Sequence, residues 1–141
     1  MKAAASTLCF LFLLATLVIS VVESLSPSTT PEQVLLSQLA ALQKDDMAGV
    51  YEYASPNNKR RTGDIQTFSM MVRQGPYKNL IGHKKADILM TSNIAASKQF
   101  LVRVLPADDP MKVVEYWWSL SRCNVGPYAG CYMVDAVIPN L

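Results

Sequence analysis

The sequence predicts an α+β domain in which helices come first and an antiparallel sheet follows. Up to Gly75 the apolar residues recur every three or four positions, as on a helix, whereas from Ala86 onward they alternate, as in a strand. Clusters of Gly, Pro, Asn and Asp separate the later segments, as between strands joined by hairpins. Such an order favours helices over one face of the sheet, so we expect about three helices on a curved sheet of about four strands.

Composition limits the classes of partner. The 141 residues fit one domain, and a 50% hydrophobic content with 17% charged residues argues against intrinsic disorder. Thirteen basic residues stand against 11 acidic ones, so the chain lacks the basic excess that neutralises many phosphates, and no nucleic-acid partner is expected. One histidine and three cysteines leave few metal ligands. We therefore expect no metal centre and no cofactor.

The N-terminus has the pattern of a secretory signal peptide. A lysine precedes the apolar run from Leu8 to Val22, which has the length of a signal-peptide core and falls short of the roughly 20 residues that span a membrane. Small or neutral residues precede a cleavage site after Ser24. The alternative is an uncleaved segment that anchors the chain in a membrane. We expect secretion, with a signal peptide over 1–24, a polar leader over 25–30 and a single domain over 31–141.

Helix signals define the first half of the domain. Thr30 can cap a helix in which Gln33 completes a capping box, and Asp64 can cap a later one. The basic run Lys59-Arg60-Arg61 is interpreted as a solvated loop, with contact to phosphate or other anionic material as its alternative. The predicted helices extend from Pro31 to about Lys44, from Met47 to Ser55, and from Ile65 to Gly75.

Four strands are predicted in the second half, and one of them has aromatic residues on both faces. Adjacent strand residues point to opposite faces, so Tyr116 and Trp118 share one face while Glu115 and Trp117 share the other. A solvated face would be polar, so one aromatic face should line a pocket or meet a second subunit. The candidate ligand-binding residues are Tyr51, Tyr116, Trp117 and Trp118. The predicted strands are Ala86–Met90, Lys98–Leu105, Val113–Cys123 and Cys131–Ile138.

The cysteines indicate a disulfide. Cys9 lies in the predicted signal peptide, which leaves Cys123 and Cys131 as an even pair in a secreted domain. These two residues end and begin facing strands, with Gly126, Pro127 and Gly130 in the connecting loop. We predict a disulfide that closes the last hairpin.

Five short segments share the pattern of one family: Leu42–Asp46, Tyr53–Pro56, Phe68–Arg73, Pro76–Lys78 and Asp135–Ile138. Together they resemble the domain of unknown function 4864 family, which is similar to the nuclear-transport-factor-2-like superfamily. The resemblance implies a cone of three helices against a curved antiparallel sheet, with a pocket inside the cone and a convex face that often meets a second subunit. Isomerases, dehydratases, transport factors and non-catalytic binders share that fold, so the resemblance implies no single activity.

An enzyme on this fold would use an Asp base, or a His-Asp pair, with a tyrosine hydroxyl in the open end of the cone. Among the candidates, His83 lies in a Gly-His-Lys-Lys segment that is interpreted as an exposed connection, and Glu115 and Asp135 are interpreted as surface charges. No Gly-x-Ser-x-Gly elbow supports a serine nucleophile. The candidates are His83, Asp87, Glu115, Asp135, Tyr51, Tyr53 and Tyr116.

We therefore predict a secreted domain that binds a small apolar ligand or pairs with a second copy of itself as a homodimer, without demonstrated catalysis. One alternative is a small lyase or isomerase with a carboxylate and a tyrosine in the pocket. Another is an extracellular structural or interaction module. A pocket with a convergent carboxylate and hydroxyl would favour the enzyme, an apolar cavity the binder, and a filled interior the interaction module.

Overall fold

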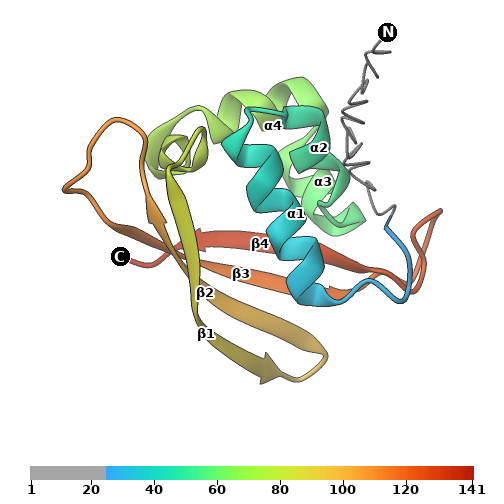
Figure 1. Cartoon of the computed structure of the whole chain (residues 1–141). Helices are drawn as coiled ribbons and strands as arrows, with labels where there is room; N and C mark the ends of the chain where they lie inside the picture. Colours follow the sequence, from blue (N-terminus) through green and yellow to red (C-terminus); the bar gives the residue numbers. More distant parts are fainter. Residues whose placement is uncertain (1–24) are drawn as a thin grey trace, which may run out of the picture.

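A layer of helices lies on one face of a four-stranded antiparallel sheet (Figure 1). The computed structural model describes residues 25–141, so the predicted signal peptide over 1–24 lies outside the described residues. No helix in the described part is long and apolar enough to cross a membrane. The elements are α1 (Pro31–Gln43), α2 (Met47–Glu52), α3 (Pro56–Thr62), α4 (Ile65–Val72), a 3-10 helix η1 (Gly75–Leu80), β1 (Lys85–Ile94), β2 (Ser97–Leu105), β3 (Val114–Arg122) and β4 (Tyr132–Pro139). This order confirms the predicted α+β class.

The first helix begins at the predicted capping box. The Thr30 hydroxyl accepts from the Gln33 backbone N–H at 3.1 Å, and the Gln33 side-chain oxygen accepts from the Thr30 N–H at 2.9 Å. Two N–H groups that the helix leaves without partners are thereby satisfied. The local sequence therefore determines where α1 begins.

One predicted loop is wrong. The basic run Lys59-Arg60-Arg61 lies in helix α3, not in a loop. The preceding helix α2 ends at Glu52, before the predicted Ser55. Ser55 and Pro56 begin α3 instead, because the Ser55 hydroxyl accepts from the Asn58 backbone N–H at 3.1 Å. Gly63, with a φ of 85° that favours glycine, ends α3.

The sheet is a meander in which each strand pairs with the next along the chain. β1 is twice as long as predicted, because its pairing with β2 continues from Lys85 to Ile94. A bulge between Ile88 and Met90 shifts the alternation of side chains between the two faces of the sheet. The residues after the bulge therefore do not continue the alternating pattern by which the strand was predicted. A second bulge between Ser119 and Leu120 interrupts the pairing of β3 with β4.

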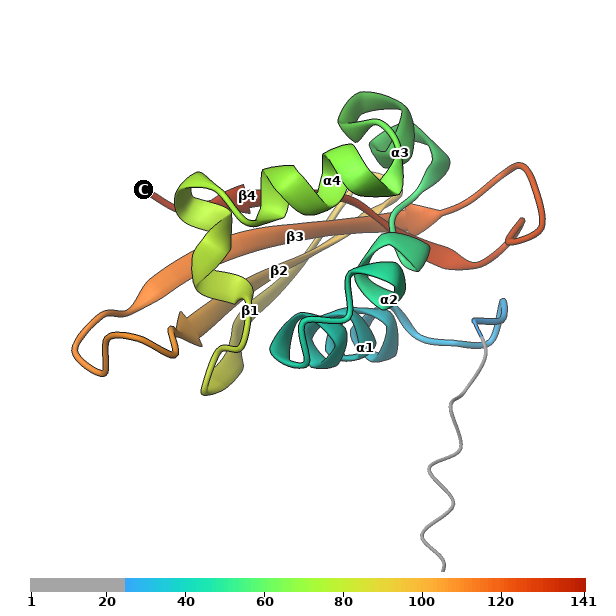
Figure 2. The ribbon, with the colours of Figure 1, turned by 90° about the horizontal axis from the view of Figure 1, so that it is seen from above.

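The core lies between the helices and the inner face of the sheet, as the view along the layers shows (Figure 2). Tyr116, Trp118 and Leu120 of β3 are buried against the helices, whereas Trp117 is partly exposed on the outer face. The two aromatic faces predicted for this strand are therefore confirmed. The inner row continues on β2 with Phe100, Val102 and Val104, and α1 adds Val34, Leu35, Leu39 and Leu42.

The structure contradicts the predicted disulfide. Cys123 and Cys131 are both buried free thiols. Their backbones pair, since the Cys123 N–H donates to the Cys131 carbonyl at 2.7 Å. The Cys123 thiol, however, donates to the Val125 carbonyl at 3.0 Å, a contact within its own loop. Backbone pairing brings the residues side by side, while the side-chain rotamer decides whether two sulfurs meet.

Candidate ligand-binding cavity

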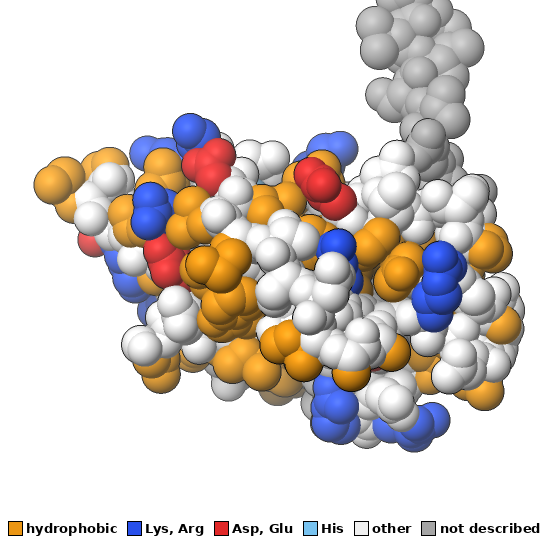
Figure 3. All heavy atoms as spheres, turned by 90° about the horizontal axis from the view of Figure 1, so that it is seen from below, with side chains coloured by type: hydrophobic (Ala, Val, Ile, Leu, Met, Phe, Trp, Pro, Cys, Tyr) orange, Lys and Arg blue, Asp and Glu red, His pale blue; other side chains and the backbone are white. Residues whose placement is uncertain are grey.

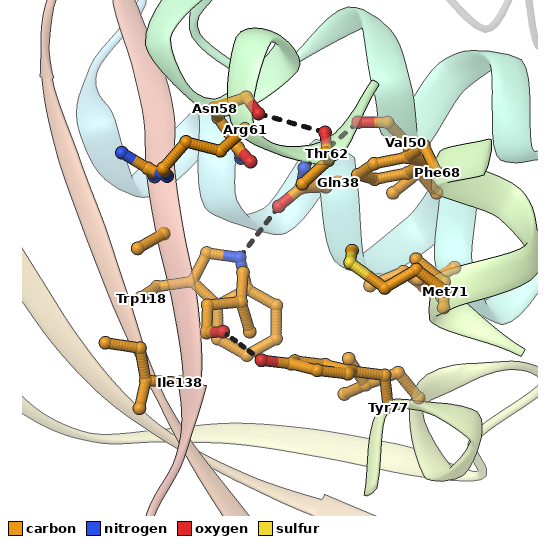
Figure 4. A pocket seen from close by; sticks show the side chains of 15 residues that line it. Gln38, Val50, Asn58, Arg61, Thr62, Phe68, Met71, Tyr77, Trp118 and Ile138 are labelled. Carbon is orange, nitrogen blue, oxygen red and sulfur yellow. Dashed lines mark hydrogen bonds between the residues drawn. The ribbon is translucent and has the colours of Figure 1, made fainter. Parts of the chain in front are cut away.

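A cavity of about 450 Å³ separates part of the helical layer from the sheet (Figure 4). This volume lies within the range of small-molecule sites in proteins. Most of the lining is apolar and comes from elements far apart in the sequence. The apolar lining residues are Leu42, Val50, Phe68, Met71, Val72, Leu80, Trp118, Ala136, Val137 and Ile138.

Helix α4 forms one side of this cavity and of its opening. Phe68 and Val72 are the buried residues of this short helix and lie one turn apart. Met71 is 37% exposed, and its thioether points into the cavity (Figure 4). The neighbouring Met70 is 62% exposed and does not line the cavity. Adjacent methionines of α4 therefore have different environments, which makes them a matched pair for experiments.

A buried hydrogen-bond network crosses the floor of the cavity. The Trp118 indole N–H donates to the Gln38 side-chain oxygen at 2.7 Å, and the Gln38 amide donates to the Val50 carbonyl at 3.0 Å. Within the described part of the chain, no buried side-chain nitrogen or oxygen lacks a partner. Gln38 thus ties β3 to α1 and α2 and holds the indole face against the cavity.

The other polar lining groups also bond to the protein. The Tyr77 hydroxyl donates to the Val137 carbonyl at 3.0 Å, and the Thr62 hydroxyl donates to the Asn58 carbonyl at 2.9 Å. The Asn58 amide donates to the Val134 carbonyl at 3.1 Å. Arg61 extends from α3 and donates to the Asp135 carbonyl of β4. No Asp or Glu occurs among the described residues that line the cavity.

The structure brings one of the four predicted ligand-binding residues to this cavity. Trp118 lines it. Tyr51 packs edge-on against Phe68 at 5.2 Å and donates to the Gly63 carbonyl, while Trp117 lies on the opposite face of the sheet. Tyr116 donates to the Pro76 carbonyl at 2.6 Å and lies beside a smaller hollow. Sequence reasoning missed Gln38, Asn58 and Tyr77, whose amides and hydroxyl gave no spacing signal.

The hydroxyl of Tyr116 is a structural group. Burial raises the pKa of this phenol above its usual value, and a hydrogen bond with Asn79 opposes that rise. The neutral hydroxyl donates to the backbone of η1 and holds this 3-10 helix against β3.

The candidate catalytic residues lie apart from the cavity. The prediction that His83 is exposed is wrong: its ring is buried, with Nδ1 2.8 Å from the Leu80 carbonyl, because Gly82 turns the chain back over η1. Glu115 pairs with Arg103 at 3.1 Å, and the Asp135 carboxylate accepts from the Ser121 hydroxyl at 2.5 Å. Asp87 lies 3.5 Å from Lys85 on β1, and Tyr53 packs against the core. None of these side chains lines the cavity.

The family model described as Domain of unknown function (DUF4864) matches residues 26–136 of this chain. The chain belongs to this family. The DUF4864 match contains every helix and most of the sheet, and all cavity-lining residues except Val137 and Ile138. No curated protein and no solved structure matches the chain significantly. The relation to the nuclear-transport-factor-2-like superfamily stays a prediction.

Proposed function

We propose that this domain binds a small, largely apolar molecule in the cavity between the helices and the sheet. The observation that carries the proposal is a volume of about 450 Å³ inside a largely apolar lining. Transfer of apolar surface from water into such a cavity is favourable, by roughly 25 cal/mol per Å². The buried polar groups of the lining already bond to the protein, so an apolar ligand would leave none of these without a partner.

The lining favours binding over the alternative functions. A lyase or isomerase of the predicted kind needs a carboxylate beside a hydroxyl, and the described lining has the hydroxyl of Tyr77 but no carboxylate. An interaction module would need no interior volume. The binder therefore accounts for the apolar cavity between the two layers.

A neutral fluorescent probe tests the proposal. We expect N-phenyl-1-naphthylamine to bind the protein with enhanced fluorescence. In Met71→Trp the added ring occupies the cavity and should weaken binding about tenfold or more. Met70→Trp places the same ring on the exposed neighbour and should bind like the wild type. Circular dichroism of all three proteins controls for folding.

The pair of variants makes the outcome decisive. Absence of probe binding by the folded wild type would contradict the proposal. Equal binding by the two tryptophan variants would place the probe elsewhere on the molecule and would also contradict it.

A row of apolar side chains on the outer face of the sheet favours a second function, which is association with another copy of the chain. The strand registers place Met90, Leu101 and Trp117 side by side across β1, β2 and β3. Ile138 of β4, which also borders the cavity, pairs with Trp117. Met90 and Ile138 are 54% and 55% exposed. Figure 3 shows hydrophobic side chains across this face, with charged ones beside them. A contiguous exposed apolar patch typically marks an interface.

Charges beside the row suit a second copy as the partner. Asp87, Arg103 and Glu115 form the next row across the sheet, with both signs on one face. In a two-fold interface each patch meets its own copy, so a surface with both signs can pair with itself. A partner of one charge would find a like charge in this row.

Sedimentation velocity tests this association. We expect the wild type to form a concentration-dependent dimer and Trp117→Ala to weaken it about tenfold or more, because large aromatic residues dominate interface energies. Ser119→Ala, on the same face, should leave the dimer unchanged. A wild type that sediments as a monomer at every concentration would refute the association.

A further inference from the structure

We infer that the ligand of the cavity carries one anionic group and that Arg61 binds this group at the opening. This inference rests on the proposed function of the cavity and specifies the chemical class of its ligand. The ligand would be an amphipathic acid, whose apolar body lies beside Trp118, Phe68 and Met71 and whose acidic group faces the guanidinium.

Among the described residues that line the cavity, Arg61 is the only one with a charged side chain. It lies in the last turn of α3, is exposed, and reaches across to β4, where one N–H donates to the Asp135 carbonyl (Figure 4). A guanidinium has several N–H donors in a planar fork that matches a carboxylate, sulfonate or phosphate. The backbone contact positions this fork and leaves further donors for a ligand.

Among the described residues, no carboxylate lies within ion-pair distance of the Arg61 guanidinium. The ion pairs between described residues join Arg73 to Asp45, Lys85 to Asp87 and Arg103 to Glu115. The nearest acidic residue in β4, Asp135, meets Arg61 through its main-chain oxygen, while its carboxylate accepts from Ser121. A ligand anion would therefore meet a positive charge that no side chain of the described domain neutralises.

The neighbouring cations do not share this position. Lys59 lies over the ring of Tyr51 at 4.9 Å, and Arg60 donates to the Asn57 side chain one turn earlier in α3. Basic residues in the last turn of a helix commonly interact with its free carbonyl groups. This interaction is enough to explain why basic residues occur together at the end of α3. Arg61 differs from both neighbours because it contacts the sheet and lines the cavity.

Two probes that differ by one sulfonate test the inference. We expect 1-anilinonaphthalene-8-sulfonate to bind about tenfold or more tightly than N-phenyl-1-naphthylamine, because hydrogen bonds to charged groups are the strong ones. Arg61→Gln should remove this preference, so that the two probes bind this variant with similar affinity. Arg61→Lys, which keeps the charge, should retain part of it, and Arg60→Gln, on the neighbouring position, should retain all of it. Added salt should reduce the preference, since Arg61 is exposed.

The outcomes separate the inference from the proposed function. If the neutral probe binds at the cavity but the anionic probe binds no more tightly, the inference fails and the proposed function stands. A sulfonate preference that survives in Arg61→Gln also overturns the inference. If neither probe binds to the folded wild type, or if Met71→Trp leaves both affinities unchanged, the proposed function fails and the inference fails with it.

Discussion

Trp118→Ala should lower the free energy of unfolding by about 3 to 5 kcal/mol, the usual cost of deleting a large buried aromatic side chain. The indole is fully buried, packs edge-on against Tyr116 at 6.0 Å, and donates to Gln38. Its removal enlarges an existing cavity and leaves the Gln38 oxygen without its donor. Urea unfolding followed by circular dichroism measures the change.

Trp117→Ala is the matched control, since it deletes the same side chain from the adjacent position of β3. Trp117 is partly exposed on the outer face, so we expect its removal to cost about 1 kcal/mol or less in the monomer. Trp118→Phe gives a smaller change that stays measurable if Trp118→Ala does not fold. Equal destabilisation by the two alanine variants would mean that both faces of β3 are core, contrary to the structure.

Gln38→Met should lower the free energy of unfolding by about 2 to 3 kcal/mol. Methionine has a similar length and can fill the same volume, but it offers no amide. The substitution leaves the buried Trp118 N–H and the Val50 carbonyl without their partner. Unsatisfied buried polar groups each cost about 1 to 3 kcal/mol, which gives the expected size.

A double-mutant cycle with Trp118→Phe isolates the Gln38–Trp118 hydrogen bond. Once phenylalanine has removed the donor, Gln38→Met should cost less than it does in the wild type, with a coupling energy of about 1 kcal/mol. Strictly additive effects would show that the hydrogen bond does not contribute to stability. Gln66→Met, at an exposed position of α4, provides a control without a buried partner.

Local signals predicted where several elements begin, but not always how far they extend or which element comes next. Thr30 and Gln33 define the start of α1 because a capping box needs only neighbouring residues. Ser55 and Pro56 are also a capping residue followed by a proline, but from the sequence we interpret them only as the end of a helix. In the structure Ser55 caps α3. For β1, the bulge beside Leu89 breaks the alternation on which the prediction depends.

The candidate site was less predictable than the fold. Trp118 was found because two adjacent tryptophans in one strand must face opposite ways. Gln38 and Tyr77 escaped prediction because each contributes a polar atom whose partner lies 60 or more residues away in the chain. Such a pairing leaves no periodic pattern in the sequence.

The sequence by itself determined the α+β class, the start of α1 and the two faces of β3. Each of these depends on residues close together in the chain, through a capping hydrogen bond or through the geometry of one strand. Only the tertiary structure decided the cavity, the burial of His83 and the contact of the Cys123 thiol with the Val125 carbonyl in place of a disulfide. These features depend on how α1, α3, α4 and the sheet pack together, and packing joins side chains that no local spacing relates.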